Sequence, residues 1–213
     1  KVYYVNRKKS LIMTTFGQRE IGAGVRLNVA HIDSPRLDLK PNPMYEKAEM
    51  AFFKTHYYGG IRKYQWAAIP LAMHGVVVKK DGEITDIRIG EEEGDPVFCV
   101  TDLLPHLAAD QNERKLKDGI KGEELNVIIG SLPFTADEDI KEPVKLLALS
   151  VLNEKYGMTE KDFIRAEIEI VPAFKAVDVG LDRSMVGAYG QDDRECSYTA
   201  LTAEMASIEP EYT

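Results

Sequence analysis

The fold class is predicted from residues 25–35, which read Val-Arg-Leu-Asn-Val-Ala-His-Ile-Asp-Ser-Pro. The hydrophobic side chains of Val25–Ala30 alternate with polar ones, as in a β-strand that buries one face. Such a strand would deliver His31 and Asp33 at its carboxyl end, where open α/β sheets place their sites. The pattern therefore predicts an α/β fold with a candidate site directly after a strand.

Other segments also have the pattern of β-strands. Ser10–Phe16 is expected to pair with Val25–Ala30 across a glycine-rich turn. Gly75–Lys79 is expected to form a hairpin with Ile84–Ile89, because the Asp-Gly turn between them tolerates the positive φ that tight hairpins need. The middle of the chain is therefore expected to be rich in strands.

Irregular structure is expected in two places. Three prolines, Pro35, Pro41 and Pro43, are expected to break regular structure after the first strands. Residues 110–128 are polar and charged, and are expected to be exposed to solvent.

The clearest helix is predicted over Glu138–Tyr156, where hydrophobic residues recur at the spacing of a single buried stripe. Thr159–Asp162 has the spacing of a capping box and precedes a predicted strand at Ile164–Val171. A second helix is predicted from near Asp193 to Ala206.

The order of these patterns predicts a nested organisation. A first α/β part covers residues 1–76, a middle part of strands and helix covers 77–177, and residues 178–213 return to α/β character. An inserted domain explains this order, because the two outer parts would belong to one domain.

Composition excludes several classes of protein. The chain has 213 residues, enough for a substantial core, and its 35 acidic and 27 basic residues give a net charge of -8. A protein that binds a nucleic-acid backbone would instead be basic. No hydrophobic run approaches the roughly 20 residues that span a bilayer. Two cysteines are too few for a disulfide scaffold, and no signal peptide precedes Lys1, so a cytoplasmic protein is expected.

His31 and Asp33 give the strongest local signal for chemistry. An imidazole can bind Zn²⁺, and a carboxylate beside it can bind metal or orient the ring by accepting its other N–H. Asp192 and Asp193 form a second candidate pair. Adjacent carboxylates often cap a helix, but Asp192 could alternatively bridge two metal ions. His31 and Asp192 do not complete a site, because catalytic zinc usually takes three protein ligands.

The remaining histidines and the cysteines favour structural roles. His56 lies beside a Gly-Gly turn, His74 beside a strong strand, and His106 at the start of a short helix. Cys99 and Cys196 are expected to be small buried hydrophobic residues. The sequence contains no Gly-x-Ser-x-Gly motif, no phosphate-binding loop and no dinucleotide fingerprint.

Six short segments follow one another in a recognisable order. They are Ala30–Pro41, Thr55–Gly60, Leu104–Leu107, Val171–Ala173, Val179–Asp182 and Gln191–Asp193. Together they resemble the M18 family of metallo-aminopeptidases, the aspartyl aminopeptidase family. The first is similar to that family's Ala-His-Thr-Asp-Ser-Pro segment, and the last stands for its Leu-Asp-Asn. Each segment alone is a weak signal, but their shared order and spacing are specific.

The resemblance implies a metallo-aminopeptidase whose α/β catalytic domain carries an inserted β-rich dimerisation domain. His31 would ligate one metal ion, Asp192 would bridge two, and Asp33 would orient His31. His106, in the inserted domain, would reach the active site of a partner subunit and help to bind the peptide substrate. The two divalent ions would be zinc, with cobalt or manganese as alternatives. The assembly would be a homo-oligomer, a dimer or a dodecamer, without nucleic-acid or membrane partners.

The sequence also departs from the family pattern. The family's general base and its remaining metal ligands follow the region that corresponds to Glu211–Thr213, so we expect a fragment that is inactive alone. The preferred N-terminal residue could be acidic or neutral, because Gln191–Arg194 differs from the family's Leu-Asp-Asn-Leu. Two alternatives remain open: a non-catalytic assembly or dimerisation module, and a metallo-aminopeptidase of the neighbouring M42 family.

Overall fold

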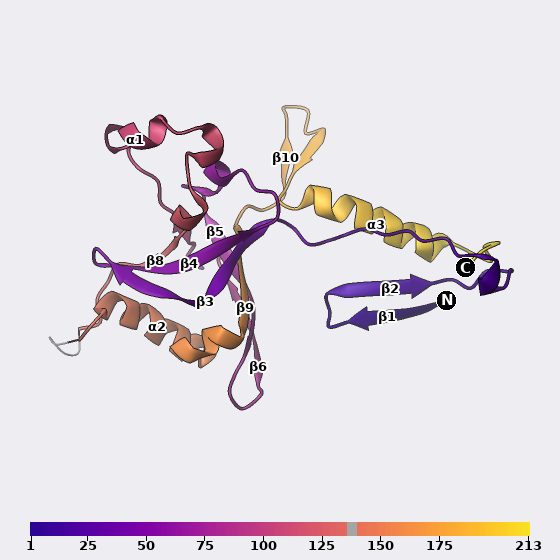
Figure 1. Ribbon diagram of the computed structural model, residues 1–213, viewed down its shortest axis with the longest axis horizontal. Helices are drawn as coiled ribbons and strands as arrows, with labels where there is room; N and C mark the ends of the chain where they lie inside the picture. The colour runs from indigo at the N-terminus through magenta and orange to yellow at the C-terminus, as the bar shows by residue number, and fades with distance from the viewer. Residues whose placement is uncertain (136–139) are drawn as a thin grey trace. The chain divides into compact units, whose positions relative to one another are not determined.

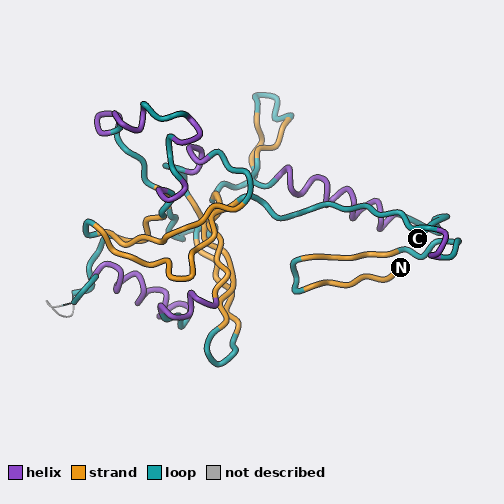
Figure 2. The backbone as a smooth tube through the Cα atoms, in the orientation of Figure 1, coloured by secondary structure: helices purple, strands orange, loops and turns teal. Residues whose placement is uncertain are grey.

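The computed structural model describes all residues except 136–139, and the chain divides into two compact units. Unit 1 comprises residues 1–34 and 190–213, and unit 2 comprises residues 35–189. Helices and strands are both present, as the α/β prediction requires (Figure 1, Figure 2).

Unit 2 is built on one seven-stranded antiparallel sheet. Its strand order is β6-β5-β9-β3-β4-β8-β7, so β6 and β7 are the two edges. The strands are β3 (Arg36–Lys47), β4 (Met50–Tyr58), β5 (Leu71–Val78), β6 (Ile84–Ile89), β7 (Cys99–Val100), β8 (Val127–Gly130) and β9 (Ala166–Pro172). The sheet thus includes residues 36–58 as well as strands from the predicted insertion. Unit 2 accordingly begins at Pro35 and ends at Tyr189.

The predicted Asp-Gly hairpin is confirmed as β5–β6. The N–H of Lys79 donates to the carbonyl of Glu83 at 2.8 Å and closes the turn. Gly82 has a φ of +88°, which glycine adopts without the clash that a Cβ would cause. The turn residues therefore fix the register of the two strands.

The expectation that the prolines break regular structure is wrong for two of them. β3 runs through Pro41 and Pro43 to Lys47. Its pairing with β4 is regular as far as Leu39 and resumes at Met44 after a register shift. Proline has no N–H to donate to a ladder. Pro41 and Pro43 lie within the irregular segment between Leu39 and Met44, where the regular ladder does not require their N–H groups. The prolines therefore interrupt the ladder without ending the strand.

One face of the sheet is covered by α2 (Pro143–Tyr156) and by the 3₁₀ helix Glu160–Arg165. The predicted helix start at Glu138 lies outside the described residues, and the helix begins at Pro143, a position where the missing N–H costs nothing. Val144 and Leu152 are buried, whereas Val151 is exposed, so the buried stripe is narrower than predicted.

The capping box after α2 is confirmed. The carboxylate of Asp162 accepts hydrogen bonds from the Thr159 N–H at 2.9 Å and from the Thr159 hydroxyl at 2.7 Å. These bonds hold a turn that inserts Phe163 into the core, where its ring packs edge-on against Phe53 with centroids 5.5 Å apart. The buried core of unit 2 thus joins this turn to the sheet.

Between β7 and β8 the chain forms α1 (Ala109–Asn112) and three 3₁₀ turns. The expectation that residues 110–128 are exposed is wrong in part. Ile120, Leu125 and Val127 are buried, because this excursion folds back onto β4. Their hydrophobic spacing is too sparse to stand out in a charged stretch.

A separate hairpin follows β9 in unit 2. It consists of β10 (Val177–Val179) and β11 (Met185–Gly187), which pair with each other. Its valines and Leu181 are exposed.

No described helix is long and apolar enough to cross a membrane.

Unit 1 contains β1 (Val2–Asn6), β2 (Ser10–Thr14), a 3₁₀ turn (Ile21–Ala23) and α3 (Gln191–Ala206). β2 confirms the first predicted strand, but its partner is β1. The predicted strand Val25–Ala30 is wrong: that segment is extended but forms no ladder, although the Arg26 N–H donates to the Thr213 carbonyl at 2.8 Å, and its Leu27 and Val29 side chains are 80% and 87% exposed. An alternating pattern yields a strand only where a neighbouring strand exchanges hydrogen bonds with it.

Unit 1 has no hydrophobic core of its own. All of its residues are described, and every buried hydrophobic side chain of the described chain lies in unit 2. An isolated two-stranded hairpin is marginal in water, and so is a helix without a packed face. Unit 1 therefore exposes surfaces that in a stable domain would be covered.

Candidate functional site

His31 and Asp33 lie together in unit 1, in the loop that follows the extended segment. Nδ1 of His31 is 3.3 Å from the backbone oxygen of Asp33 and 3.4 Å from its Oδ1 atom. The side chain of His31 is 61% exposed. A contact at Nδ1 leaves Nε2 as the nitrogen available to a ligand.

The second carboxylate near this imidazole comes from α3. Oδ1 of Asp193 lies 3.9 Å from His31 Nδ1, and the Asp193 side chain is only 6% exposed. Asp192 is exposed and is not within ion-pair distance of His31. Adjacent helical residues point about 100° apart, so the two carboxylates leave the helix in different directions, and Asp193 is the one beside His31.

The start of α3 is shaped by Gly190. Its φ of +75° is in the left-handed region, and a Cβ there would collide with the Arg194 guanidinium and approach the Ser34 hydroxyl. The glycine thus allows residues 31–34 to lie close to the first turn of α3. Sequence reasoning missed the part that Asp193 plays here, because a cap and a site carboxylate have the same sequence pattern.

The donor types at this site suit zinc, but the set is incomplete. Histidine nitrogen and carboxylate oxygen are common zinc ligands. Among the described residues, no group of three or more His, Cys, Asp or Glu side chains is arranged to hold a metal ion. The described chain therefore contributes part of a metal site and does not complete one.

His106 lies in unit 2, in the 3₁₀ turn Pro105–Leu107. It is exposed, and so are its neighbours Leu103, Leu104 and Leu107. An exposed imidazole flanked by exposed leucines is unusual for a surface that faces only water.

The other two histidines contact neighbouring side chains. Nε2 of His74 lies 3.2 Å from Oε1 of Glu91, and the His56 ring stacks on Tyr57 with centroids 5.7 Å apart. The expectation that both cysteines are buried is wrong: Cys99 is half-buried, and Cys196 is exposed on α3.

Asp182, from one of the six recognised segments, lies in the β10–β11 turn. Its carboxylate accepts hydrogen bonds from the hydroxyl and the N–H of Ser184, at 3.0 and 3.3 Å. These bonds hold the pKa of Asp182 below its usual value. The contacts are those of a turn-stabilising residue.

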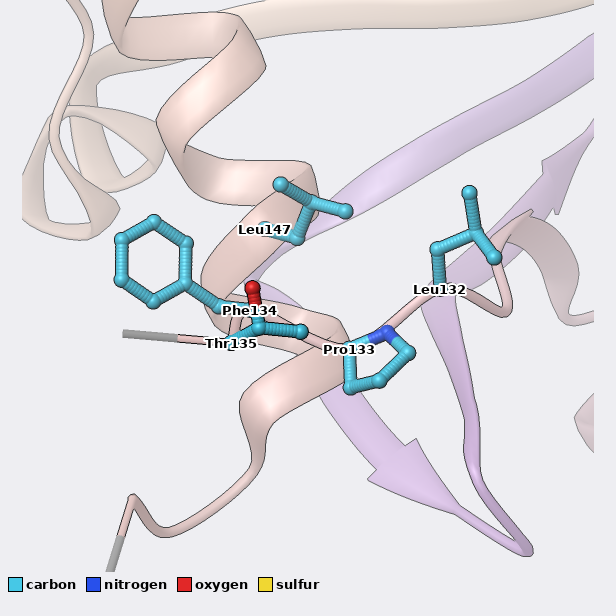
Figure 3. A pocket seen from close by; sticks show the side chains of 5 residues that line it. All are labelled: Leu132, Pro133, Phe134, Thr135 and Leu147. Carbon is cyan, nitrogen blue, oxygen red and sulfur yellow. The ribbon is translucent and has the colours of Figure 1, made fainter. Parts of the chain in front are cut away.

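A cavity of about 540 Å³ lies elsewhere in unit 2, between α2 and residues 132–135. It is lined by Leu132, Pro133, Phe134, Thr135 and Leu147, as Figure 3 shows. None of the predicted site residues contributes to its lining. The described part of its lining is mostly apolar and offers no group for acid–base or metal chemistry.

Residues 1–212 match the family model described as Aminopeptidase I zinc metalloprotease (M18). A relative from Clostridium acetobutylicum, named Probable M18 family aminopeptidase 1, is 55% identical over 203 residues, which are 95% of this chain and 43% of the relative. The crystal structure of aminopeptidase I from that organism has a TM-score of 0.90 at 50% identity, covering 99% of this chain and 46% of that one. An M18 aminopeptidase structure from Thermotoga maritima has a TM-score of 0.81 at 54% identity, covering 89% and 41%. The chain thus spans less than half the length of these relatives.

Proposed function

The chain belongs to the M18 family of zinc metalloproteases, and from that premise we propose that the whole protein is a metal-dependent aminopeptidase. It would remove acidic or neutral N-terminal residues from peptides in the cytoplasm. Two divalent metal ions, most simply zinc, would supply an activated water for hydrolysis. The match to the family model over residues 1–212 is the observation that carries this proposal.

We assign His31 as a metal ligand, Asp192 as the bridging carboxylate, and Asp33 as a positioning residue that orients His31. The 3.4 Å separation between Asp33 Oδ1 and His31 Nδ1 supports the last role. A carboxylate that contacts Nδ1 fixes the orientation of the imidazole ring and leaves Nε2 for the metal ion. Asp193 is buried beside His31, so it is an alternative to Asp192 as the carboxylate that contacts the metal.

The chain of 213 residues is proposed to be inactive alone. Two observations support this. The described residues assemble no group of three metal-binding side chains, and unit 1, which carries His31, buries no hydrophobic side chain. The general base and the remaining ligands would then come from sequence outside this chain.

The whole protein is also proposed to be a homo-oligomer, with His106 entering a partner's site to help bind the peptide. The exposed leucines beside His106 support this role, because they would be buried in a subunit contact.

One experiment tests the activity and a second tests the ligands. In the first, the chain is incubated with Zn²⁺ and the p-nitroanilides of aspartate, alanine and leucine. We expect no turnover above buffer, and robust turnover would contradict the proposed inactivity.

In the second experiment, zinc affinity is measured by competition with a chromophoric chelator. His31→Ala and Asp192→Asn should each weaken binding by roughly tenfold or more, and Asp193→Asn should weaken it less. A larger effect at Asp193 than at Asp192 would assign the ligand role to Asp193. The exposed Asp110→Asn is the matched control, because it removes the same charge far from His31 in the sequence.

The incomplete ligand set also supports a second candidate, a non-catalytic assembly module. That function predicts that the whole protein, too, lacks aminopeptidase activity with any divalent metal. The M42 alternative is disfavoured, because the family model that matches is that of M18.

A further inference from the structure

β6 is an edge strand of the sheet, and the side chain of Tyr156 contacts its outer side at Arg88. Among the described residues it pairs only with β5, at one end of the sheet (Figure 1). The carbonyl of Arg88 accepts a hydrogen bond from the Tyr156 hydroxyl at 3.0 Å, so this carbonyl is directed away from β5. Because backbone groups alternate in an antiparallel ladder, those of Ile84 and Asp86 are also directed outward.

Two opposite charges project from this edge. Asp86 and Arg88 are two residues apart, so their side chains lie on the same face of the sheet. Both are exposed, and neither side chain forms a hydrogen bond or ion pair with any described residue. Charges on an edge strand normally discourage pairing with other chains, unless the incoming strand carries the complementary pattern.

We propose that β6 pairs with β6 of a second copy of this chain, antiparallel, about a two-fold axis at Ile87. An axis at Asp86 would place two aspartates directly opposite each other, which is unfavourable. An axis at Ile87 instead places each Asp86 opposite the partner's Arg88 and sets Ile87 against the partner's Ile87. The charge pattern therefore selects one register.

The backbone of the edge is compatible with this register. Asp86 and the partner's Arg88 become a hydrogen-bonded pair that exchanges two N–H···O bonds, and the two-fold axis repeats the pair. The Arg88 carbonyl has two lone pairs, so it can keep its bond from Tyr156 and accept another. The exposed Ile84 would lie opposite the partner's Gly90, at the end of the paired segment.

This inference deepens the proposed homo-oligomer by naming a contact surface, and it rests on that proposal only for the expectation of self-association. A contact of one strand pair is smaller than a standard interface, so we expect weak self-association, with a dissociation constant on the order of tens of micromolar. Sedimentation velocity between about 5 and 200 micromolar chain spans that range.

The test is a charge exchange. Asp86→Arg and Arg88→Asp should each weaken self-association by roughly tenfold or more, because both symmetric pairs become repulsive. An equimolar mixture of the two variants should associate again, since one strand then carries two positive and the other two negative charges. Asp110→Arg, at an exposed and unpaired site on α1, is the control and should associate like the unmodified chain.

Three results would overturn the proposal. If both single variants associate like the unmodified chain, self-association stands but does not use β6. If the variants dissociate and their mixture stays monomeric, the charges do not face one another. If the unmodified chain is monomeric throughout, both this contact and the self-association of the chain fail, while the family assignment is unaffected.

Discussion

Two threonines of unit 2 should respond in opposite ways to the same substitution. The hydroxyl of Thr85, on β6, is buried and has no hydrogen-bond partner among the described residues. The hydroxyl of Thr55, on β4, is also buried but donates to the carbonyl of Leu125. Valine has nearly the shape of threonine and carries a methyl group in place of the hydroxyl, so the Thr→Val substitution mainly removes the polar group.

The magnitudes follow from what each hydroxyl does. A buried polar group without a partner costs about 1–3 kcal/mol, so Thr85→Val should raise the free energy of unfolding by about 1 kcal/mol. Thr55→Val removes a bond and leaves the Leu125 carbonyl unpaired, so it should lower the free energy of unfolding by about 2 kcal/mol. The two variants should therefore differ by about 3 kcal/mol.

Urea unfolding measures both values. The single tryptophan, Trp66, is buried in unit 2 and reports on the unfolding of that unit. The midpoints should move in opposite directions with unchanged slopes, because neither substitution alters the surface exposed on unfolding. A lower midpoint for Thr85→Val would refute the reasoning, since it would mean that the hydroxyl has a partner in solution.

Three further predictions concern other contacts. The pKa of Asp162 lies below its usual value because the Thr159 hydroxyl and N–H donate to its carboxylate, so its stabilising effect should be present above about pH 4 and lost as pH falls through that lowered pKa. Asp162→Asn should remove this part of the pH dependence of unfolding measured between pH 2 and 7. Gly75→Ala should lower the free energy of unfolding by about 2 kcal/mol or more, because its Cβ would collide with the Glu167 carbonyl, and a matched Gly130→Ala, on β8 of the same sheet and in open space, should cost little in the same urea assay. Limited proteolysis followed by mass spectrometry should cleave unit 1 first and leave a resistant core within residues 35–189, and equal resistance of both units would contradict the absence of a core in unit 1.

Local chemistry made much of unit 2 predictable. The Asp-Gly turn fixed the β5–β6 hairpin, and Thr159–Asp162 formed the expected capping box, because each device is complete within a few residues. β3 was missed because proline is read as a breaker, whereas its effect depends on whether the ladder needs that N–H. Leu125 was missed because its burial depends on β4, which lies far away in the sequence.

The strand predicted at Val25–Ala30 failed for a different reason. The alternation of its side chains is genuine, and the segment is extended, with Leu27 and Val29 directed to solvent. A strand is a property of a pair of segments, and among these residues no second segment forms a ladder with it. The alternating pattern therefore indicates that one face of this segment needs to be covered, and unit 1 by itself does not cover it.

The candidate site has the same dependence on distant segments. His31 and Asp33 are neighbours in sequence, so their contact could be anticipated from a two-residue spacing. The choice between Asp192 and Asp193 could not, because it depends on the rotation of α3 about its axis relative to His31, which lies far away in the sequence. A helix presents only one of two adjacent carboxylates to a given neighbour. If Asp192 has the proposed bridging role, the metal ions would lie on the exposed side of α3. The remaining ligands would then have to approach α3 from that same side.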